Sequence, residues 1–247
     1  MEGLELFNVE QTWNLLAPFG INSPFFSLTA STIINTWIVL LVLGALIAFI
    51  RFFIYKSTLV SHIVHSFIAS FMDLCVQSIG TFSYHHFIFV FSIFVFVLMC
   101  NWIALIPFVE EPTKDINTAL ALGCISFFYK EFYAIKVHGF GAYMQEFFRP
   151  FFVMFPLNVI SHFSKIISIS FRLFGNIFGG SIISTIYTNA VSYSLFTELL
   201  GLFSGINFLV IGFFILFEGL IQAFVFTMLT VTYLAIALQA EEEGGLE

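Results

Sequence analysis

The sequence predicts an all-α integral membrane protein with five membrane-crossing helices and one amphipathic surface helix. Of its 247 residues, 60% are hydrophobic and only 9% are charged, whereas soluble domains are about 45–50% apolar and about 25% charged. Three apolar stretches, at residues 30–50, 87–109 and 199–239, exceed the roughly 18 residues that mark a transmembrane helix. The third stretch is long enough for one strongly tilted helix or for two helices.

Residues 1–29 are expected to form an external N-terminal segment. The chain begins with acidic residues and lacks the basic region followed by an apolar run that marks a signal peptide. The first span is predicted at 30–54, with Arg51 and Lys56 at its end. Because lysine and arginine resist translocation, that end is predicted to face the cytoplasm and the N-terminus to lie outside.

Residues 57–80 are predicted to form an amphipathic helix that lies on the membrane surface. Apolar residues recur there at helical spacing, and polar residues occupy the opposite face. The apolar face consists of Leu59, Val60, Ile63, Val64, Phe67, Ile68, Phe71 and Met72.

Two further spans are predicted at 87–109 and 116–136. The turn residues Pro112, Thr113 and Asp115 lie between them and indicate an external loop.

The second of these spans carries Lys130 and Glu131 near its end, and we expect both side chains to snorkel to the interface. Lys130, Lys136 and Arg149 place the following loop in the cytoplasm.

Residues 150–240 are predicted to form two long helices. Polar residues at 188–194 suggest an outer turn between them, and the C-terminus then lies in the cytoplasm. The first helix carries His162, Lys165, Arg172 and Asn176 within apolar sequence.

Arg172 is the least expected residue of the chain. A charge near the bilayer centre costs on the order of 2.5–3.5 kcal/mol on insertion scales, and arginine does not escape this cost by deprotonating. At helical spacing Arg172 shares one face with five small residues. These are Ser161, Ser164, Ser168, Gly175 and Gly179. The small-residue stripe suits close approach by another helix that bears a carboxylate.

Two partners for Arg172 follow from this pattern. One is an internal carboxylate, for which Glu218 is the candidate. The other is an ionisable group on another subunit or on a substrate. Glu218, Gln222 and Thr230 share a face of the last helix, and a hydrated pocket is the setting that tolerates Glu218 in its charged form.

Cysteine and basic-residue usage excludes several other functions. Cys75, Cys100 and Cys124 lie in three separate segments without CxxC spacing, so the sequence predicts no disulfide framework and no metal site. We expect no cofactor. A basic footprint for nucleic acid is absent from the sequence.

Five ordered motifs resemble those of the a subunit of F-type ATP synthases, the membrane stator and ion-channel subunit. The run SISFRLFGNIFGG at 168–180 is similar to the family's RLFGN signature, and IQAFVFTMLTVTYL at 221–234 to its last-helix signature. The other three motifs, in the same order as in the family, are NWIALIPF at 101–108, PTKDIN at 112–117 and PLNVI at 156–160.

The resemblance implies a fold, partners and a function. The two helices of 150–240 would form a tilted hairpin against the ring of c subunits. Two offset aqueous half-channels and the arginine would couple flow of H⁺, or of Na⁺, to rotation and ATP synthesis. The chain would not be an enzyme on its own. Its partners would be the c-ring, the subunit b stalk, the remaining Fo and F1 subunits and the lipid bilayer, in the bacterial inner membrane.

The resemblance also implies roles for individual residues. Arg172 would be the stator arginine that faces the c-ring carboxylates. Asn176 and Gln222 would lie near it, and Asp115 would lie at the outer channel mouth. Lys165 would have a supporting role. For Lys165 the alternative is simple snorkelling, and for Asp115 it is an N-cap of the next span, a role compatible with the channel one.

The chain departs from the family pattern at the inlet. Ser181 and Ser161 stand where many members carry glutamate or, at Ser181, histidine. Ile215 occupies the usual place of the last-helix ionisable residue, so Glu218 is expected to serve as the inlet carboxylate. His162 either replaces the missing glutamate as a proton relay, because histidine titrates near neutral pH, or is a packed polar residue.

Two other classes of protein fit less well. A secondary transporter with Arg172 on an anionic substrate predicts internal repeats and matching broken helices, which the sequence lacks. A purely structural scaffold predicts no ionisable residues at membrane depth, which Arg172 and Glu218 contradict.

Overall fold

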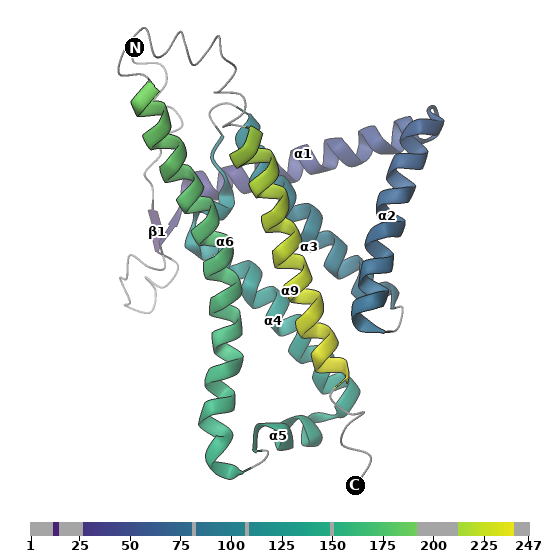
Figure 1. Ribbon diagram of the computed structural model, residues 1–247, viewed down its shortest axis with the longest axis vertical. Helices are drawn as coiled ribbons and strands as arrows, with labels where there is room; N and C mark the ends of the chain where they lie inside the picture. The colour runs from purple at the N-terminus through teal and green to yellow at the C-terminus, as the bar shows by residue number, and fades with distance from the viewer. Residues whose placement is uncertain are drawn as a thin grey trace. The chain divides into compact units, whose positions relative to one another are not determined.

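The computed structural model describes residues 12–14, 27–80, 83–106, 109–148, 151–191 and 212–239. Nearly all of these residues are helical, and the prediction of an all-α membrane protein is confirmed (Figure 1). The six α-helices that precede the last segment are α1 (Ala30–Ile54), α2 (Thr58–Ile79), α3 (Tyr84–Trp102), α4 (Ile116–His138), α5 (Phe140–Phe148) and α6 (Phe155–Val191). A π-helical segment, Gly212–Glu218, then leads into α9 (Gly219–Gln239).

Shorter elements complete the described chain. Three 3₁₀ turns occur at Ile103–Leu105, Pro112–Lys114 and Phe152–Met154. Strands β1 (Thr12–Asn14) and β2 (Ser27–Thr29) pair antiparallel within the segment that we predict to be external. The rest of that segment, the connection at 192–211 and the acidic C-terminal end lie outside the described residues.

Five helices of the described chain are long and apolar enough to cross a membrane. Their number equals the predicted one, but the set differs. The helix α2, predicted to lie on the surface, qualifies by length and composition, and its surface location stays a prediction. The helix α4, predicted to cross, does not qualify, and it carries Lys130, Glu131 and Lys136. The qualifying segments are Ala30–Ile54, Thr58–Ile79, Tyr84–Leu105, Phe152–Tyr187 and Ile215–Leu238.

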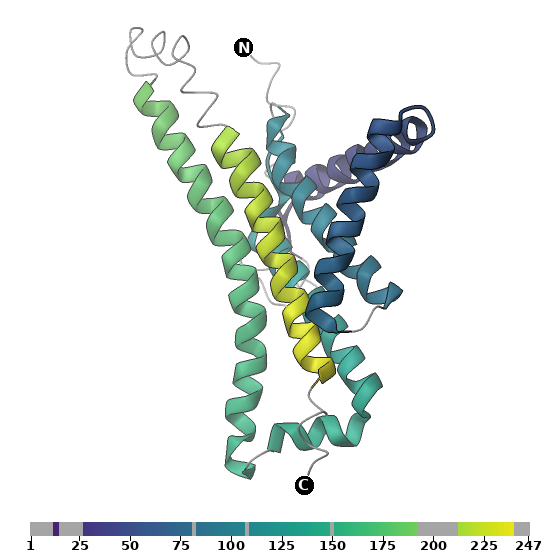
Figure 2. The ribbon, with the colours of Figure 1, turned by 45° about the vertical axis from the view of Figure 1, so that its right-hand side comes forward.

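The chain divides into two compact units, whose boundary passes within α1, α3, α4, α6 and α9. Unit 1 comprises residues 1–48, 96–119 and 173–223. Unit 2 comprises residues 49–95, 120–172 and 224–247. The longest helix, α6, runs without a break (Figure 2). It has 37 residues, and Arg172 is the last of them that belongs to unit 2.

Unit 1 is held together by an apolar cluster and by two polar side chains at the end of α3. Val39, Cys100 and Ile103 form the cluster. Asn101 Nδ2 donates to the backbone oxygen of Gly219 at 3.0 Å, and Trp102 Nε1 donates to that of Leu216 at 3.2 Å.

These two bonds lie where the π-helical segment passes into α9. The wider π turn changes the backbone hydrogen-bond register, and side-chain donors compensate carbonyl groups at such a transition. The close approach also needs Gly219, because a Cβ there would lie 3.0 Å from Asn101 Cβ. The end of α3 therefore fixes the backbone on both sides of Glu218.

Unit 2 has an aromatic core and one close helix contact. Phe71 of α2 packs against Phe87, Phe91 and Phe94 of α3, with ring centroids 5.1–6.3 Å apart. On α4, a side chain at Gly123 would overlap Ser170 Oγ of α6, so this glycine permits the contact between the two helices.

Glycine also sets the turn between α4 and α5. Gly139 has φ of 81°, a left-handed conformation that ends a helix with little cost only for glycine. Its N–H donates to the backbone oxygen of Ile135 at 2.9 Å. The chain then re-enters a helix within one residue, which brings Tyr143 of α5 back to α4.

Candidate functional site

Arg172 lies on an exposed face of α6. Ser161, Ser164, Ser168 and Gly175 of the predicted stripe are also exposed, and Gly179 is half-buried. Among the described residues of unit 2, none forms an ion pair or a hydrogen bond with the Arg172 guanidinium. The stripe is therefore an open surface of this chain, with a permanent positive charge in it.

A small polar pocket lies in unit 1 beside the C-terminal half of α6. It has a volume of about 80 Å³, and we call it the carboxylate pocket. This exceeds the roughly 10–15 Å³ that a cavity needs to hold a water molecule. Its lining residues are Asn101, Glu111, Asn176, Ile177, Gly180, Ser181, Ile215, Glu218, Gly219 and Gln222.

Two contacts pair α6 antiparallel with the last helix in this pocket. Asn176 Nδ2 donates to Gln222 Oε1 at 2.5 Å. Four residues further along α6, a Cβ at Gly180 would lie 3.1 Å from Glu218 Oε2, so the absent side chain leaves space for the carboxylate. Ser181 Oγ donates to the backbone oxygen of Phe178 at 2.8 Å.

Gln222 leaves one donor unused in the pocket. The residue is only 2% exposed, and its Nε2 has no hydrogen-bond partner among the described residues. A buried amide N–H without a partner costs about 1–3 kcal/mol, so polar occupants such as water are favoured here.

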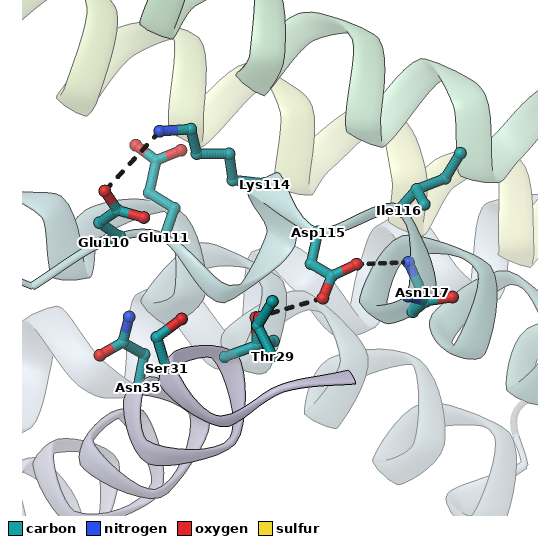
Figure 3. A pocket seen from close by; sticks show the side chains of 10 residues that line it. Thr29, Ser31, Asn35, Glu110, Glu111, Lys114, Asp115, Ile116 and Asn117 are labelled. Atoms are coloured by element: carbon teal, nitrogen blue, oxygen red, sulfur yellow. Dashed lines mark hydrogen bonds and ion pairs between the residues drawn. The ribbon is translucent and has the colours of Figure 1, made fainter. Parts of the chain in front are cut away.

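A second, larger pocket of unit 1 lies where the 109–117 loop meets the start of α1 (Figure 3). It has a volume of about 620 Å³, and we call it the loop pocket. Lys114 Nζ lies 3.9 Å from Glu110 Oε1 at its rim. The lining residues are Thr29, Ser31, Thr32, Asn35, Glu110, Glu111, Lys114, Asp115, Ile116 and Asn117.

Asp115 caps α4 and lines the loop pocket at the same time. Its Oδ1 accepts the backbone N–H of Asn117 at 2.9 Å, which is the N-cap bond to the second helical residue. Its Oδ2 accepts the Thr32 hydroxyl at 3.2 Å. The N-cap alternative is therefore correct, and it leaves the carboxylate at the pocket.

Unit 2 has an open pocket on the serine side of α6. It has a volume of about 470 Å³, and we call it the serine pocket. Lys165 Nζ lies 5.8 Å from the centroid of the Tyr233 ring, within cation–π distance. Lining residues are Leu157, Ile160, Ser161, Ser164, Lys165, Ser168 and Tyr233.

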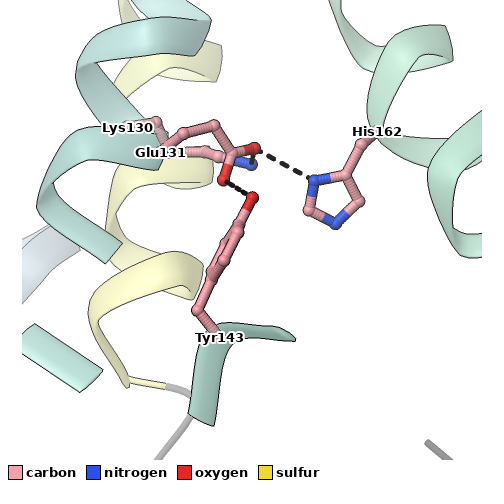
Figure 4. A network of polar contacts seen from close by, with 4 residues as sticks. All are labelled: Lys130, Glu131, Tyr143 and His162. Atoms are coloured by element: carbon pink, nitrogen blue, oxygen red, sulfur yellow. Dashed lines mark hydrogen bonds and ion pairs between the residues drawn. The ribbon is translucent and has the colours of Figure 1, made fainter. Parts of the chain in front are cut away.

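A buried polar cluster lies elsewhere in unit 2 (Figure 4). Lys130 and Glu131 are 7% and 8% exposed, and Lys130 Nζ lies 2.6 Å from Glu131 Oε1. Tyr143 donates its hydroxyl proton to Glu131 Oε2 at 2.5 Å, and His162 Nδ1 lies 3.0 Å from Oε1. The prediction that Lys130 and Glu131 snorkel to the interface is wrong. Both side chains are buried, Lys130 pairs with Glu131, and the Glu131 carboxylate also contacts Tyr143 of α5 and His162 of α6.

Known proteins resemble this chain over most of its length. The family model described as ATP synthase A chain matches residues 23–235. The ATP synthase subunit a of Moorella thermoacetica is 32% identical over 206 residues, which cover 83% of this chain and 89% of the relative.

The chain belongs to the ATP synthase A chain family.

Two further relatives agree. The ATP synthase subunit a 1 of Prosthecochloris aestuarii is 30% identical over 216 residues, which cover 86% of this chain and 91% of the relative. The ATP synthase subunit a of Aliarcobacter butzleri is 37% identical over 157 residues, which cover 62% of this chain and 63% of the relative. The family predicted from the five motifs is confirmed, and this A chain is a multi-pass membrane component of an ATP synthase complex.

The structure of this A chain brings part of the predicted site together. Four predicted residues, Glu218, Asn176, Gln222 and Ser181, line the carboxylate pocket. Asp115 lines the loop pocket, and Ser161 lines the serine pocket with Lys165.

His162 belongs to unit 2 and is not among the residues that line the carboxylate pocket. Its Nδ1 lies 3.0 Å from Glu131 Oε1, and this contact fits the packed polar alternative.

Glu111 is a pocket residue that the sequence did not single out. It is half-buried and lines both the carboxylate pocket and the loop pocket. Burial raises the pKa of Glu111 to about 7, with Lys114 opposing the shift and the carboxylates of Glu218 and Glu110 adding to it. The sequence gives only a weak indication of this position. Two glutamates precede Pro112, and of two adjacent side chains one commonly turns toward the protein interior.

Proposed function

We propose that this chain is the ion-translocating stator subunit of a rotary ATP synthase, and that Arg172 faces the ion-binding carboxylates of a ring of c subunits. The carrying observation is the exposed stripe of small residues around an exposed arginine. A guanidinium at membrane depth needs an anionic partner, and the stripe allows a neighbouring helix to approach closely. A ring helix that presents one carboxylate fits both requirements.

The chemistry of the arginine follows from electrostatics. A fixed cation beside a carboxylic acid favours its ionised form, so a ring site that arrives at Arg172 releases its proton. The resulting carboxylate passes the arginine and takes up a proton on the other side. Each elementary charge that crosses about 100 mV contributes roughly 2.3 kcal/mol, so several ions are needed for one ATP.

The three pockets suit the two half-channels of this mechanism. The serine pocket is lined by α6 residues that precede Arg172, such as Ser168, and we assign it to the outlet. The carboxylate pocket is lined by α6 residues that follow it, such as Asn176, and we assign it with the loop pocket to the inlet. The arginine between them on α6 opposes direct passage of a cation along that helix.

The remaining expectations complete the proposal. We infer that the N-terminus lies outside and the C-terminus lies in the cytoplasm of a bacterial inner membrane. The direct partners are the c-ring and the subunit b stalk, and the translocated ion is H⁺ or Na⁺. Lys165, stacked on Tyr233, supports the wall of the outlet pocket.

The test is Arg172→Ala in the assembled ATP synthase, reconstituted into vesicles. We expect loss of ATP synthesis driven by an ion gradient, while subunit a remains inserted and the complex still hydrolyses ATP. The matched control is Arg51→Ala, which removes an exposed arginine at the end of α1. Substantial ion-coupled synthesis by the Arg172→Ala complex would contradict the proposal.

A further inference from the structure

Glu111 connects two pockets that have no other lining residue in common among the described residues. On one side it lines the loop pocket with Glu110, Lys114 and Asp115 (Figure 3). On the other side it lines the carboxylate pocket with Glu218. A proton that moves from the larger pocket to the smaller one therefore meets the Glu111 carboxylate.

Buried hydrogen bonds hold the loop that carries Glu111 against the helix that carries Glu218. Thr113, fully buried, donates its hydroxyl proton to Asn101 Oδ1 at 3.1 Å. The same Asn101 donates from Nδ2 to the backbone oxygen of Gly219 at 3.0 Å. These two bonds join positions two residues after Glu111 and one residue after Glu218, so the two carboxylates are held near each other by the backbone.

The charged groups that act on Glu111 are known for each neighbouring element of unit 1. Lys114 and Glu110 lie on its own loop, and Glu218 lies on the last helix. Lys114 is also in contact with Glu110, so its charge is shared between the two loop carboxylates. With a second carboxylate nearby and partial burial, protonation of Glu111 is favoured well above the usual range of a glutamate.

We infer that Glu111 and Glu218 form a two-carboxylate proton relay that carries protons from the loop pocket into the carboxylate pocket. The inference rests on the proposed function, because it assigns the entry step of the inlet half-channel. Glu218 is then not the only carboxylate of the inlet. The loop carboxylate of Glu111 supplies the second ionisable group.

The relay transfers one proton without any other reactant. The Glu111 carboxylate takes a proton from a hydronium ion in the loop pocket, which leaves water and the neutral acid. The acid passes its proton, through water in the carboxylate pocket, to the Glu218 carboxylate, and Glu111 returns to its ionised form. Two interacting carboxyl groups titrate as a pair, so one of them holds a proton over a wide pH range.

The donors in the carboxylate pocket favour a proton over a bound metal cation. Gln222 Nε2 and Asn176 Nδ2 are N–H donors, and the unpartnered Gln222 Nε2 repels a cation but donates to water or to a carboxylate. A sodium ion would instead need several oxygen ligands at once.

The test is Glu111→Gln in the complete ATP synthase, reconstituted into vesicles, with ATP-driven proton pumping and gradient-driven ATP synthesis as readouts. Glutamine keeps the size of the side chain but cannot bind and release a proton. We expect both rates to fall about tenfold, less than the roughly 10²–10⁴-fold contribution of a proton-transfer group, because water can bypass it in part. Glu111→Asp should recover part of the loss.

The matched control is Glu110→Gln. Glu110 is exposed and directly precedes Glu111 in the sequence. It lines the loop pocket but not the carboxylate pocket, and it pairs with Lys114. We expect this variant to lose much less pumping than Glu111→Gln, because Glu110 does not line the carboxylate pocket.

A pH profile separates a relay from a merely structural role. In the wild type we expect the synthesis rate to fall as the pH on the inlet side rises through about 7, the pKa of Glu111. Below that pH Glu111 is protonated and can donate its proton, and above that pH it is deprotonated. The Glu111→Gln complex should lose this dependence while keeping its ATPase activity.

The outcomes distinguish the relay from the proposed function. If Glu111→Gln pumps like Glu110→Gln and keeps the wild-type pH profile while Arg172→Ala is inactive, the relay is wrong and the stator assignment stands. If Arg172→Ala retains coupled synthesis, the stator assignment itself is wrong. If pumping depends on sodium and not on pH, a cation pathway replaces the proton relay.

Discussion

Glu218 in unit 1 and Glu131 in unit 2 are both carboxylates in a predominantly apolar chain, but their surroundings differ. Glu131 is buried and contacts Lys130, Tyr143 and His162. Glu218 lies against Gly180, in a pocket that also holds Glu111 and an unpartnered amide of Gln222. One carboxylate has a cation and two further partners, and the other has space and a second carboxylate.

This difference separates a structural charge from one that can exchange protons. A carboxylate fully occupied by a cation and hydrogen bonds stays ionised and keeps three helices in place. A carboxylate beside a second carboxylate and without a cation is easier to protonate, because two nearby negative charges repel each other. Burial of a glutamate in this protein therefore does not by itself indicate a channel residue. The groups that contact its carboxylate distinguish the two roles.

The largest expected effect comes from removing the structural carboxylate. Glu131→Leu leaves Lys130 buried without a partner, and breaking a buried pair in this way costs roughly 3–5 kcal/mol. We expect a strong loss of subunit a from the membrane, measured by immunoblot, and a lower melting temperature of the complex. Glu218→Gln should leave the amount of complex unchanged and lower proton pumping instead.

A double variant shows whether charge is the cause. Lys130→Met with Glu131→Leu removes both ions, and apolar replacements of a buried pair are often neutral. The double variant should therefore recover a large part of the subunit that Glu131→Leu loses. Equal loss in both variants would mean that Glu131 acts through its shape and not through the pair.

Sequence reasoning recovers the parts of the site that lie on single helices. The spacing of Ser161, Ser164, Ser168 and Arg172 at three or four residues fixes a common face whatever surrounds the helix, and that face is exposed. The same rule groups Glu218 with Gln222, whereas the hydrogen bond between Gln222 and Asn176 is seen only in the structure. The family, too, follows from motif order alone.

The parts that depend on contacts between distant segments were not recoverable in this way. Glu111 becomes a pocket residue because Thr113 bonds to Asn101 and Asn101 bonds to the last helix, a link across more than 100 residues. Burial of the Lys130–Glu131 pair depends on Tyr143 and His162 from two other helices, which contact Glu131. The position of the pair near the end of one helix suggests snorkelling instead. The long apolar run up to Gln239 gave no sign of the π-helical segment that ends at Glu218.

A smaller effect is expected from two closely packed glycines, one in each unit. Gly123→Ala would place a methyl group on Ser170 Oγ and 3.4 Å from the backbone oxygen of Ile166, in a tight contact between α4 and α6. Overpacking of this kind costs about 1–3 kcal/mol. We expect a lower melting temperature of the complex, with rescue by Ser170→Ala, which removes a buried hydroxyl that has no partner among the described residues.

Gly180→Ala is the counterpart in unit 1. Its methyl group would meet the tip of the Glu218 side chain at 3.1 Å, and a flexible tip can move aside. We therefore expect little change in the melting temperature but a reduced pumping rate, because the carboxylate is displaced. If Gly180→Ala destabilises the complex as much as Gly123→Ala does, the pocket around Glu218 is as rigid as the α4–α6 contact, and the contrast between the two regions fails.

The smallest effect concerns Asp115, which combines a structural and a channel-side position in one residue. Asp115→Ala removes the N-cap of α4 and should cost about 1 kcal/mol, seen as a small drop in melting temperature. Asp115→Asn keeps a capping oxygen of similar strength but removes the charge from the loop pocket. We expect Asp115→Asn to leave the melting temperature unchanged and to slow proton entry, so that the synthesis rate falls most at high pH on the inlet side, where protons are scarce. Equal synthesis by Asp115→Asn and the wild type at every pH would assign Asp115 to helix capping alone and leave Glu111 as the first carboxylate on the path to Glu218.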